Sequence, residues 1–245
     1  TIQYQFGYKQ AVTEAIGADV TLFYKDIRDL LGLEYITTYS DAEYTRLTNV
    51  DFGSVAGFTV AIDQRPIGWL RSRLDYTFQV AQGNSSDPEE TATQIEKGAD
   101  KRPRSIPLNW DQRHTFNLSV ELTQPGRFSV GAIVRAATGQ PYTPTVGVGG
   151  FGSGLEINSG RKPSVFLVDL RGERGWRMGK MGASFFGRVF NLLDTPFFNG
   201  FVFQSTGSPY YGLLVSEIPA SQDPLRLYTP RRIELGLTFM GGGLK

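Results

Sequence analysis

His114 and Ser119 are the residues whose types could carry out nucleophilic catalysis, and His114 is the single histidine of the chain. A lipid-hydrolysing serine enzyme needs its histidine within hydrogen-bond reach of the serine. The surrounding segment alternates polar and apolar residues as a strand does, and five residues of strand span about 16 Å and reverse the face. The two side chains therefore cannot pair. We interpret His114 as a polar residue at the start of a strand, and expect no enzymatic activity.

Two runs of like charge could bind ions. Asp87, Glu89 and Glu90 could ligate Ca²⁺, while the basic residues Lys101, Arg102 and Arg104 could contact the phosphates of lipopolysaccharide. Both runs fall in one long polar connection, and a solvated loop is the simpler interpretation of each. A net charge of +1 gives no reason to expect a nucleic-acid partner.

A glycine-rich segment follows further along the chain. It lacks the strand–turn–helix context of a phosphate-binding loop, so we interpret it as a flexible loop. Its glycines are Gly147, Gly149, Gly150, Gly152 and Gly154. The absence of cysteine excludes a thiolate metal site, and no cofactor or resident metal is expected.

The elements that must position these residues show an alternation of period two. No run of about 18 apolar residues occurs, so no transmembrane helix is encoded. The alternating segments are instead about 9–11 residues long, which is the length of a strand that crosses a bilayer at a tilt. There are nine, centred on residues 2–8, 18–24, 58–62, 70–80, 115–122, 128–134, 166–170, 183–189 and 232–239.

The connections between these segments alternate in length. Residues 10–14, 65–68, 123–127 and 172–180 are expected to be tight turns, and residues 26–54, 82–112, 138–163 and 192–228 long loops. Outer-membrane barrels sort their loops in this way, whereas a soluble sandwich has no reason to. Trp69 and Trp176 beside tight turns, with Tyr24 and Tyr228 near long loops, suit interfacial aromatic girdles. We therefore predict an all-β, antiparallel, up-and-down transmembrane barrel.

Charged residues fall in the polar phase of the segments. In a barrel they would face the lumen, either as a hydrated pore lining or as the docking surface of a plug. Their mixed signs predict ion pairs across neighbouring strands. The expected charged wall comprises Arg71, Arg73, Asp75, Arg135, Asp169, Arg171 and Arg188.

The number of strands indicates whether the chain could form a whole barrel. A single-chain bacterial barrel has an even number of strands and both ends in the periplasm, whereas nine strands that end in the periplasm would begin outside. We therefore expect residues 1–245 to be the C-terminal part of one outer-membrane barrel domain, with an odd number of strands upstream.

Several strings along the whole chain, taken in order, resemble the C-terminal part of TonB-dependent receptors, the 22-stranded energised importers of the bacterial outer membrane. The resemblance is closest to the large receptors that carry a carboxypeptidase-regulatory-like domain ahead of the plug. The strings cover residues 24–30, 55–58, 110–114, 139–145, 158–163 and 189–194, and the last comprises 230–232 with 236–239.

The resemblance implies a receptor-transporter for a large or scarce solute, coupled to the TonB–ExbB–ExbD system through a plug and a TonB-binding segment that this chain lacks. It also implies thirteen further strands. Glu234, Gly236, Leu237 and Phe239 in the last strand resemble the terminal signal read by the barrel-assembly machinery. The alternative from another class is a passive porin or structural barrel without TonB coupling.

Overall fold

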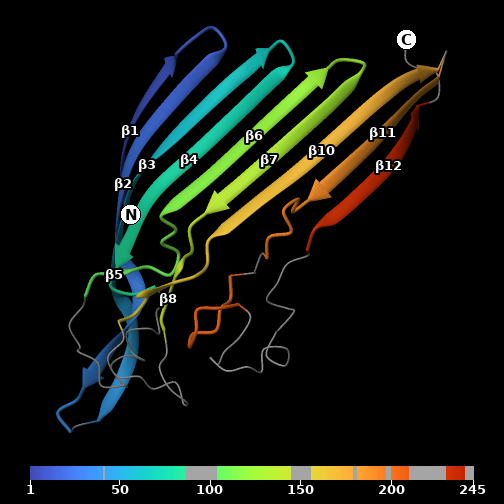
Figure 1. The fold of residues 1–245 in the computed structure, drawn as a ribbon. Coiled ribbons are helices and arrows are strands. Elements are labelled where there is room, and N and C mark those ends of the chain that lie inside the picture. Colours follow the sequence, from blue (N-terminus) through green and yellow to red (C-terminus); the bar gives the residue numbers. More distant parts are fainter. Residues whose placement is uncertain are drawn as a thin grey trace, which may run out of the picture.

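One antiparallel sheet makes up most of the described chain (Figure 1). The computed structural model describes residues 1–40, 42–86, 104–144, 156–178, 181–196, 200–209 and 230–240. Within these residues, nine long strands are hydrogen-bonded to one another in chain order. They are β1 (Ile2–Ala11), β2 (Ile16–Thr37), β3 (Glu43–Ile67), β4 (Leu70–Gly83), β6 (His114–Gln124), β7 (Phe128–Ala137), β10 (Val165–Met178), β11 (Met181–Phe190) and β12 (Arg232–Met240).

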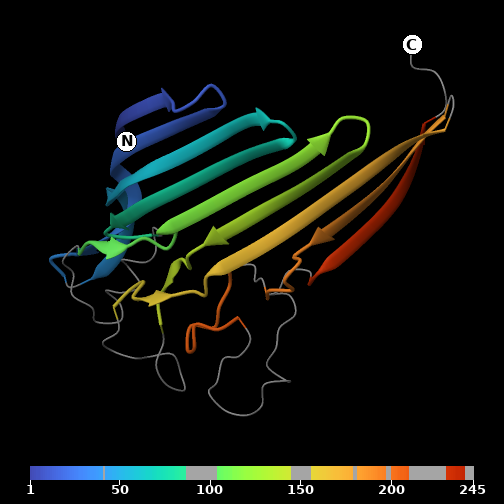
Figure 2. The ribbon, with the colours of Figure 1, turned by 45° about the horizontal axis from the view of Figure 1, so that its top comes forward.

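Three two-residue strands complete the described secondary structure. The strand β5 (Ile106–Pro107) pairs with the end of β4, and β8 (Pro141–Tyr142) pairs with β9 (Gly160–Arg161). All three lie at the end of the sheet where the long loops gather (Figure 2). Among the described residues, no helix is long and apolar enough to cross a membrane.

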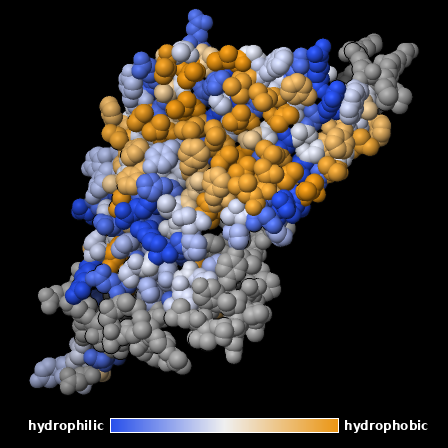
Figure 3. Space-filling model, viewed as in Figure 1, coloured by the Kyte–Doolittle hydropathy of each residue, from blue (hydrophilic) through white to orange (hydrophobic). Residues whose placement is uncertain are grey.

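The register keeps the two phases of the alternation apart across the sheet. Leu74 lies opposite Ile62 on one side and Leu118 on the other, whereas Asp75 lies opposite Ala61 and Asn117. The sheet therefore has an apolar face, which contains Leu74, and a polar face, which contains Asp75. Figure 3 shows hydrophobic residues gathered in a band across the sheet, with hydrophilic residues toward the long loops. The nine predicted strands and their phase are confirmed by this sheet.

Glycine makes two of the tight turns possible. Gly68 and Gly126 have φ angles of 62° and 74°, in the left-handed region that residues with a Cβ rarely adopt. They connect β3 to β4 and β6 to β7, and together with the β1–β2 connection they define the short-turn end of the sheet.

The expected long loop at residues 26–54 is wrong. The two strands β2 and β3 run on beyond the rest of the sheet and pair as a hairpin as far as Thr37 and Glu43. Irregular pairing between Ile27 and Leu31 bends the ladder, with Asp29 at a φ of 60°. Beyond it the pairing resumes, and Glu34 and Arg46 form an ion pair at 2.6 Å. The apolar alternation continues here in the other phase, with Leu31 and Leu33 on either side of Gly32 and Leu33 opposite Leu47.

The expected turn at residues 172–180 is also too long, because β10 continues to Met178. Arg174 consequently occupies an apolar-face position, opposite Phe128. A cationic side chain on the lipid face costs about 2–4 kcal/mol at the bilayer midplane and about 0–1 kcal/mol near an interface. Its place near the short-turn end, with its guanidinium 5.8 Å from the centre of the Trp176 ring, fits an interfacial depth.

A small apolar core lies on the polar face, at the long-loop end. Val55 and Ala81 are opposite one another in β3 and β4, and both are buried against Leu108. Phe23 and Ile27 from β2 pack around them. The chain after β5 therefore folds back onto the polar face and covers this part of the sheet.

We predict that Leu74→Arg impairs barrel assembly in the full-length protein far more than Thr77→Arg. Leu74 lies four residues from the start of β4 on the apolar face, where the cost of a cation reaches about 2–4 kcal/mol. Thr77 faces the other way and shares a 3.2 Å hydrogen bond with Thr59. Heat-modifiable migration of the folded barrel on gels would measure assembly. Equal tolerance of the two substitutions would contradict the assignment of the faces.

Candidate functional site

The polar face carries a hollow of about 800 Å³ between β4 and β11. Six of the seven residues of the predicted charged wall line it, and Asp75 lies beside it in an ion pair with Arg73 at 3.0 Å. The lining residues from the prediction are Arg71, Arg73, Arg135, Asp169, Arg171 and Arg188. Strand register brings together side chains that are more than one hundred residues apart in the sequence.

Ion pairs hold most of these arginines in place. Arg135 of β7 pairs with Asp169 of β10, and Arg188 of β11 with Glu234 of β12 at 3.8 Å. These are cross-strand pairs of the expected kind. Arg171 instead pairs with Glu173 in its own strand at 3.4 Å. Arg71 has no ion-pair partner among the described residues, which leaves its charge available in the hollow.

Asp169 links this wall to the loop that leaves β11. One oxygen accepts a hydrogen bond from the backbone N–H of Asn191 at 2.9 Å, while the other pairs with Arg135. Asn191 and Asp194 adopt φ angles of 51° and 54°. Asp194 accepts a 2.8 Å hydrogen bond from the N–H of Arg231, just before β12. The two ends of the connection between β11 and β12 are therefore tied together.

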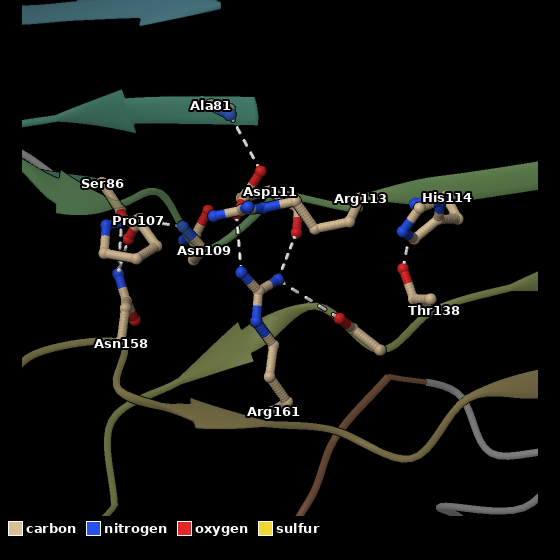
Figure 4. A network of polar contacts seen from close by, with 11 residues as sticks. Ala81, Ser86, Pro107, Asn109, Asp111, Arg113, His114, Thr138, Asn158 and Arg161 are labelled. Carbon is tan, nitrogen blue, oxygen red and sulfur yellow. Dashed lines mark hydrogen bonds and ion pairs between the residues drawn. The ribbon is translucent and has the colours of Figure 1, made fainter. Parts of the chain in front are cut away.

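A second carboxylate, Asp111, is the centre of a polar network at the long-loop end (Figure 4). Its side chain is fully buried. It accepts hydrogen bonds from the N–H of Ala81 at 2.8 Å, from Arg113 Nε at 2.7 Å and from Arg161 Nη2 at 2.7 Å. Arg161 also donates to the backbone oxygen of Asp111 at 2.7 Å. The carboxylate satisfies a strand N–H where β4 and β6 part.

The charge of Asp111 is maintained by these contacts. Burial alone would raise the pKa of this carboxyl, but hydrogen bonds from Ala81, Arg113 and Arg161, with the positive charge of Arg113, lower it below its usual value. The side chain is thus an anion at neutral pH. Nearby, burial lowers the pKa of the Lys162 ammonium.

Asn158 ties a third segment to the same place. Its side-chain amide donates to Ser86 Oγ at 3.0 Å and to the backbone oxygen of Pro107 at 2.8 Å, and its own N–H donates to Thr143 at 3.1 Å. Together with Arg161 it fastens the chain around β8 and β9 to the segment between β5 and β6 (Figure 4).

The sequence did not predict this network. In the sequence, Asp111, Asn158 and Arg161 stand out only as members of strings that resemble the family, and 50 residues separate Asp111 from Arg161. The available signal was that polar strings of specific order, at residues 110–114, 139–145 and 158–163, all flank long loops on neighbouring strands.

His114 lies on the apolar face, and the predicted partner Ser119 does not. It begins β6, and its Nδ1 is 2.8 Å from the hydroxyl of Tyr76, with the ring beside Phe78. Ser119 lies opposite Arg73, on the polar face. The predicted separation of the two side chains is observed.

The other predicted residues take these positions. Trp69 and Trp176 are exposed near the short-turn end, and Tyr24 stacks on Tyr4 with ring centres 6.5 Å apart. In the last strand, Leu237 and Phe239 are exposed on the apolar face. Gly236 lies opposite Phe186, whose ring covers it so closely that a Cβ there would collide.

Several expectations fall outside the described residues. These concern a Ca²⁺ site, a basic run, the glycine-rich loop and one interfacial aromatic, at Asp87, Glu89, Glu90, Lys101, Arg102, Gly147, Gly149, Gly150, Gly152, Gly154 and Tyr228. Within the described part, no group of three or more potential ligands could hold a metal ion.

Comparison with known proteins places this sheet in a family. The family profile described as "TonB dependent receptor-like, beta-barrel" matches residues 1–192. The chain belongs to this family. It is therefore an outer-membrane protein of the Gram-negative type, with its short-turn end toward the periplasm and its long-loop end outside.

Solved structures support the fold at low sequence identity. The ferric-catecholate import receptor Fiu of Escherichia coli K12 matches with a TM-score of 0.56 and 16% identity, over 97% of this chain and 27% of Fiu. The outer membrane transporter YddB of E. coli matches with a TM-score of 0.60 and 12% identity, over 97% of this chain and 32% of YddB. The ferripyoverdine receptor of Pseudomonas aeruginosa matches with a TM-score of 0.58 and 13% identity, over 97% of this chain and 26% of that receptor. No curated protein matched.

We predict that Asp111→Ala exposes the Ala81 amide of the full-length receptor to solvent exchange. Removing the acceptor leaves a buried N–H and two guanidinium groups without their partner, a cost of about 1–3 kcal/mol for each such loss. Hydrogen exchange at Ala81 should rise by at least about tenfold. Asp111→Asn is the matched control, because it keeps an acceptor for the N–H and should change that exchange much less. Unchanged exchange in the alanine variant would contradict the role assigned to the carboxylate.

We also predict that Asp169→Ala destabilises the receptor more than Arg135→Gln. The arginine makes one solvent-exposed ion pair, worth about 0.2–1 kcal/mol. The carboxylate additionally accepts the Asn191 N–H, whose loss costs about 1–3 kcal/mol. Urea unfolding of the full-length receptor in detergent would compare the two midpoints. A larger loss in the arginine variant would show that Asp169 does not hold the loop.

Proposed function

We propose that this sheet is the C-terminal part of the barrel of an energised importer, which takes up a solute too large or too scarce for passive porins. The family match over residues 1–192 carries the proposal. The chain spans about a quarter to a third of the solved structures it matches. In the proposed full receptor, thirteen further strands and a plug precede residue 1, together with a segment that engages the TonB–ExbB–ExbD system.

The similar structures suggest the scale of the solute. Fiu is a ferric-catecholate import receptor, and the Pseudomonas protein was solved with ferripyoverdine bound. Another similar structure, OprC, is a copper transporter. A scarce solute that must be captured outside and moved against its gradient would require a coupled receptor, and we propose that class without choosing the solute.

The charged hollow supports this function. Most of its arginines have a carboxylate partner, so these charges are held in a fixed arrangement at the surface of the sheet. Such a surface suits either a water-filled path or a polar domain seated inside the barrel. The long-loop end, which the Asp111 network braces, would present the loops that meet the solute.

The other proposed partners follow from the location. The apolar face would meet lipid, with lipopolysaccharide at the long-loop end, and the last strand would be read by the barrel-assembly machinery through Glu234, Gly236, Leu237 and Phe239. We propose no enzymatic activity, since His114 and Ser119 lie on opposite faces. Variants of Asp111 and of the charged wall serve as controls. Lipid hydrolysis that these variants retain and that His114→Ala abolishes would overturn the proposal that the protein is not an enzyme.

Ion conductance separates the importer from the alternative, a passive porin. A barrel that is closed by a plug should show no steady conductance when the purified full-length protein is added to a planar lipid bilayer, because the lumen is filled. A porin would give stable open-channel steps in the same bilayer. Steady conductance by the intact protein would sink the importer, whereas a silent bilayer together with uncoupler-sensitive solute uptake in cells would support it.

A further inference from the structure

A second hollow, of about 620 Å³, lies at the short-turn end between β7 and β10. Four of its lining residues, Gln124, Phe128, Arg174 and Trp176, are in the apolar phase of the sheet, whereas Arg127 belongs to the turn between β6 and β7 and Gly175 is in the polar phase. Its lining is Gln124, Arg127, Phe128, Arg174, Gly175 and Trp176. Nothing in the transport function uses this position.

Backbone contacts fix the two arginines of this hollow with respect to each other. Arg174 lies directly opposite Phe128, the residue after Arg127. The N–H of Gly175 donates to the backbone oxygen of Arg127 at 3.2 Å, and the N–H of Arg127 donates to the oxygen of Gln124 at 3.0 Å. The turn and the neighbouring strand are thereby joined, and the two arginines that they carry line the same hollow.

The charges of these two arginines are not neutralised by the protein. Among the residues that the structure describes, neither Arg127 nor Arg174 forms an ion pair, whereas four of the five arginines in the charged hollow do. Both are exposed. Arg174 contacts the face of Trp176, which orients the guanidinium but supplies no negative charge. Two cations that line one hollow without an ion-pair partner favour an anion there.

The surrounding aromatic residues set the depth of the site. Trp69 lies edge-on to Phe128 with ring centres 6.2 Å apart, and Trp176 is 46% exposed. Tryptophans on the lipid-facing side of a barrel mark the boundary between hydrocarbon and headgroups. The anion available at this depth is a lipid phosphate.

We propose that this hollow binds the headgroup phosphate of an anionic glycerophospholipid in the periplasmic leaflet. Arg127 and Arg174 donate hydrogen bonds to the phosphate oxygens, a geometry for which guanidinium groups are suited. Trp176 and Phe128 pack against the glycerol and the upper acyl chain. An anionic lipid is preferred to a zwitterionic one because it brings no cation of its own toward the arginines.

Native mass spectrometry of the full-length receptor in detergent tests this proposal. The receptor is equilibrated with equal amounts of dioleoylphosphatidylglycerol and dioleoylphosphatidylcholine, and the lipids that it retains are counted. We expect the wild type to retain the glycerol lipid preferentially. Arg127→Gln and Arg174→Gln should each weaken that binding by about fivefold, the contribution of one cation at a lipid surface, and the double variant should lose it.

Arg65→Gln is the matched control, since it removes an exposed arginine from the same end of the sheet but outside this hollow. It should retain the lipid as the wild type does. Heat-modifiable migration on gels checks that each variant is folded. The double variant Arg127→Lys with Arg174→Lys keeps both charges, so it tests the role of charge if a glutamine variant does not fold. Equal retention of the two lipids by the wild type would overturn the proposal. Undiminished binding in the double glutamine variant, or an equal loss in Arg65→Gln, would do so too.

Discussion

The structure depends on one constraint: each backbone N–H and C=O that lacks water must find a partner within the protein. Along the nine long strands the antiparallel ladder meets this constraint. Where two neighbouring strands diverge, side chains supply the hydrogen-bond acceptors. Asp111 accepts the N–H of Ala81 between β4 and β6, and Asp169 accepts that of Asn191 beyond β11. Each of these carboxylates also binds an arginine. The same side chain therefore satisfies a backbone N–H and holds a charged residue of the polar face in place.

The two faces divide the work of the molecule. The apolar face carries mostly hydrophobic side chains with a few polar pairs, such as Tyr76 with His114. Its one described cation on β10, Arg174, lies near the short-turn end beside Trp176. The polar face carries charges most of which are held in ion pairs, and the buried apolar core of the described residues lies on it at the long-loop end. On the polar face, the ring of Phe23 covers Gly57 and the ring of Phe186 covers Gly236. In each case the glycine lies opposite the phenylalanine on the neighbouring strand. Aromatic rings over glycine fill a sheet surface that is otherwise lined by small and charged residues.

The sequence predicted what is local and missed what is distant. Period-two alternation identified nine strands and their phase, because one face meets lipid along each strand. It missed the outer parts of β2 and β3, because irregular pairing near Leu30 shifts the phase and Leu31 and Leu33 no longer continue the alternation of residues 18–24. The charged wall was predicted because its members share a phase. The Asp111 network was not, because no pattern within a strand relates Asp111 to Arg161 or Asn158.

The tie between Arg161 and Asp111 has an evolutionary consequence. A loop whose two ends are already held together gains or loses residues at small entropic cost, about 0.6 kcal/mol for each doubling of its length. The chain between β8 and β9 leaves from and returns to such a fastening point. Its sequence can therefore diverge without disturbing the sheet below. A lineage could acquire a new ligand by altering the tip of this loop while inheriting an unchanged wall.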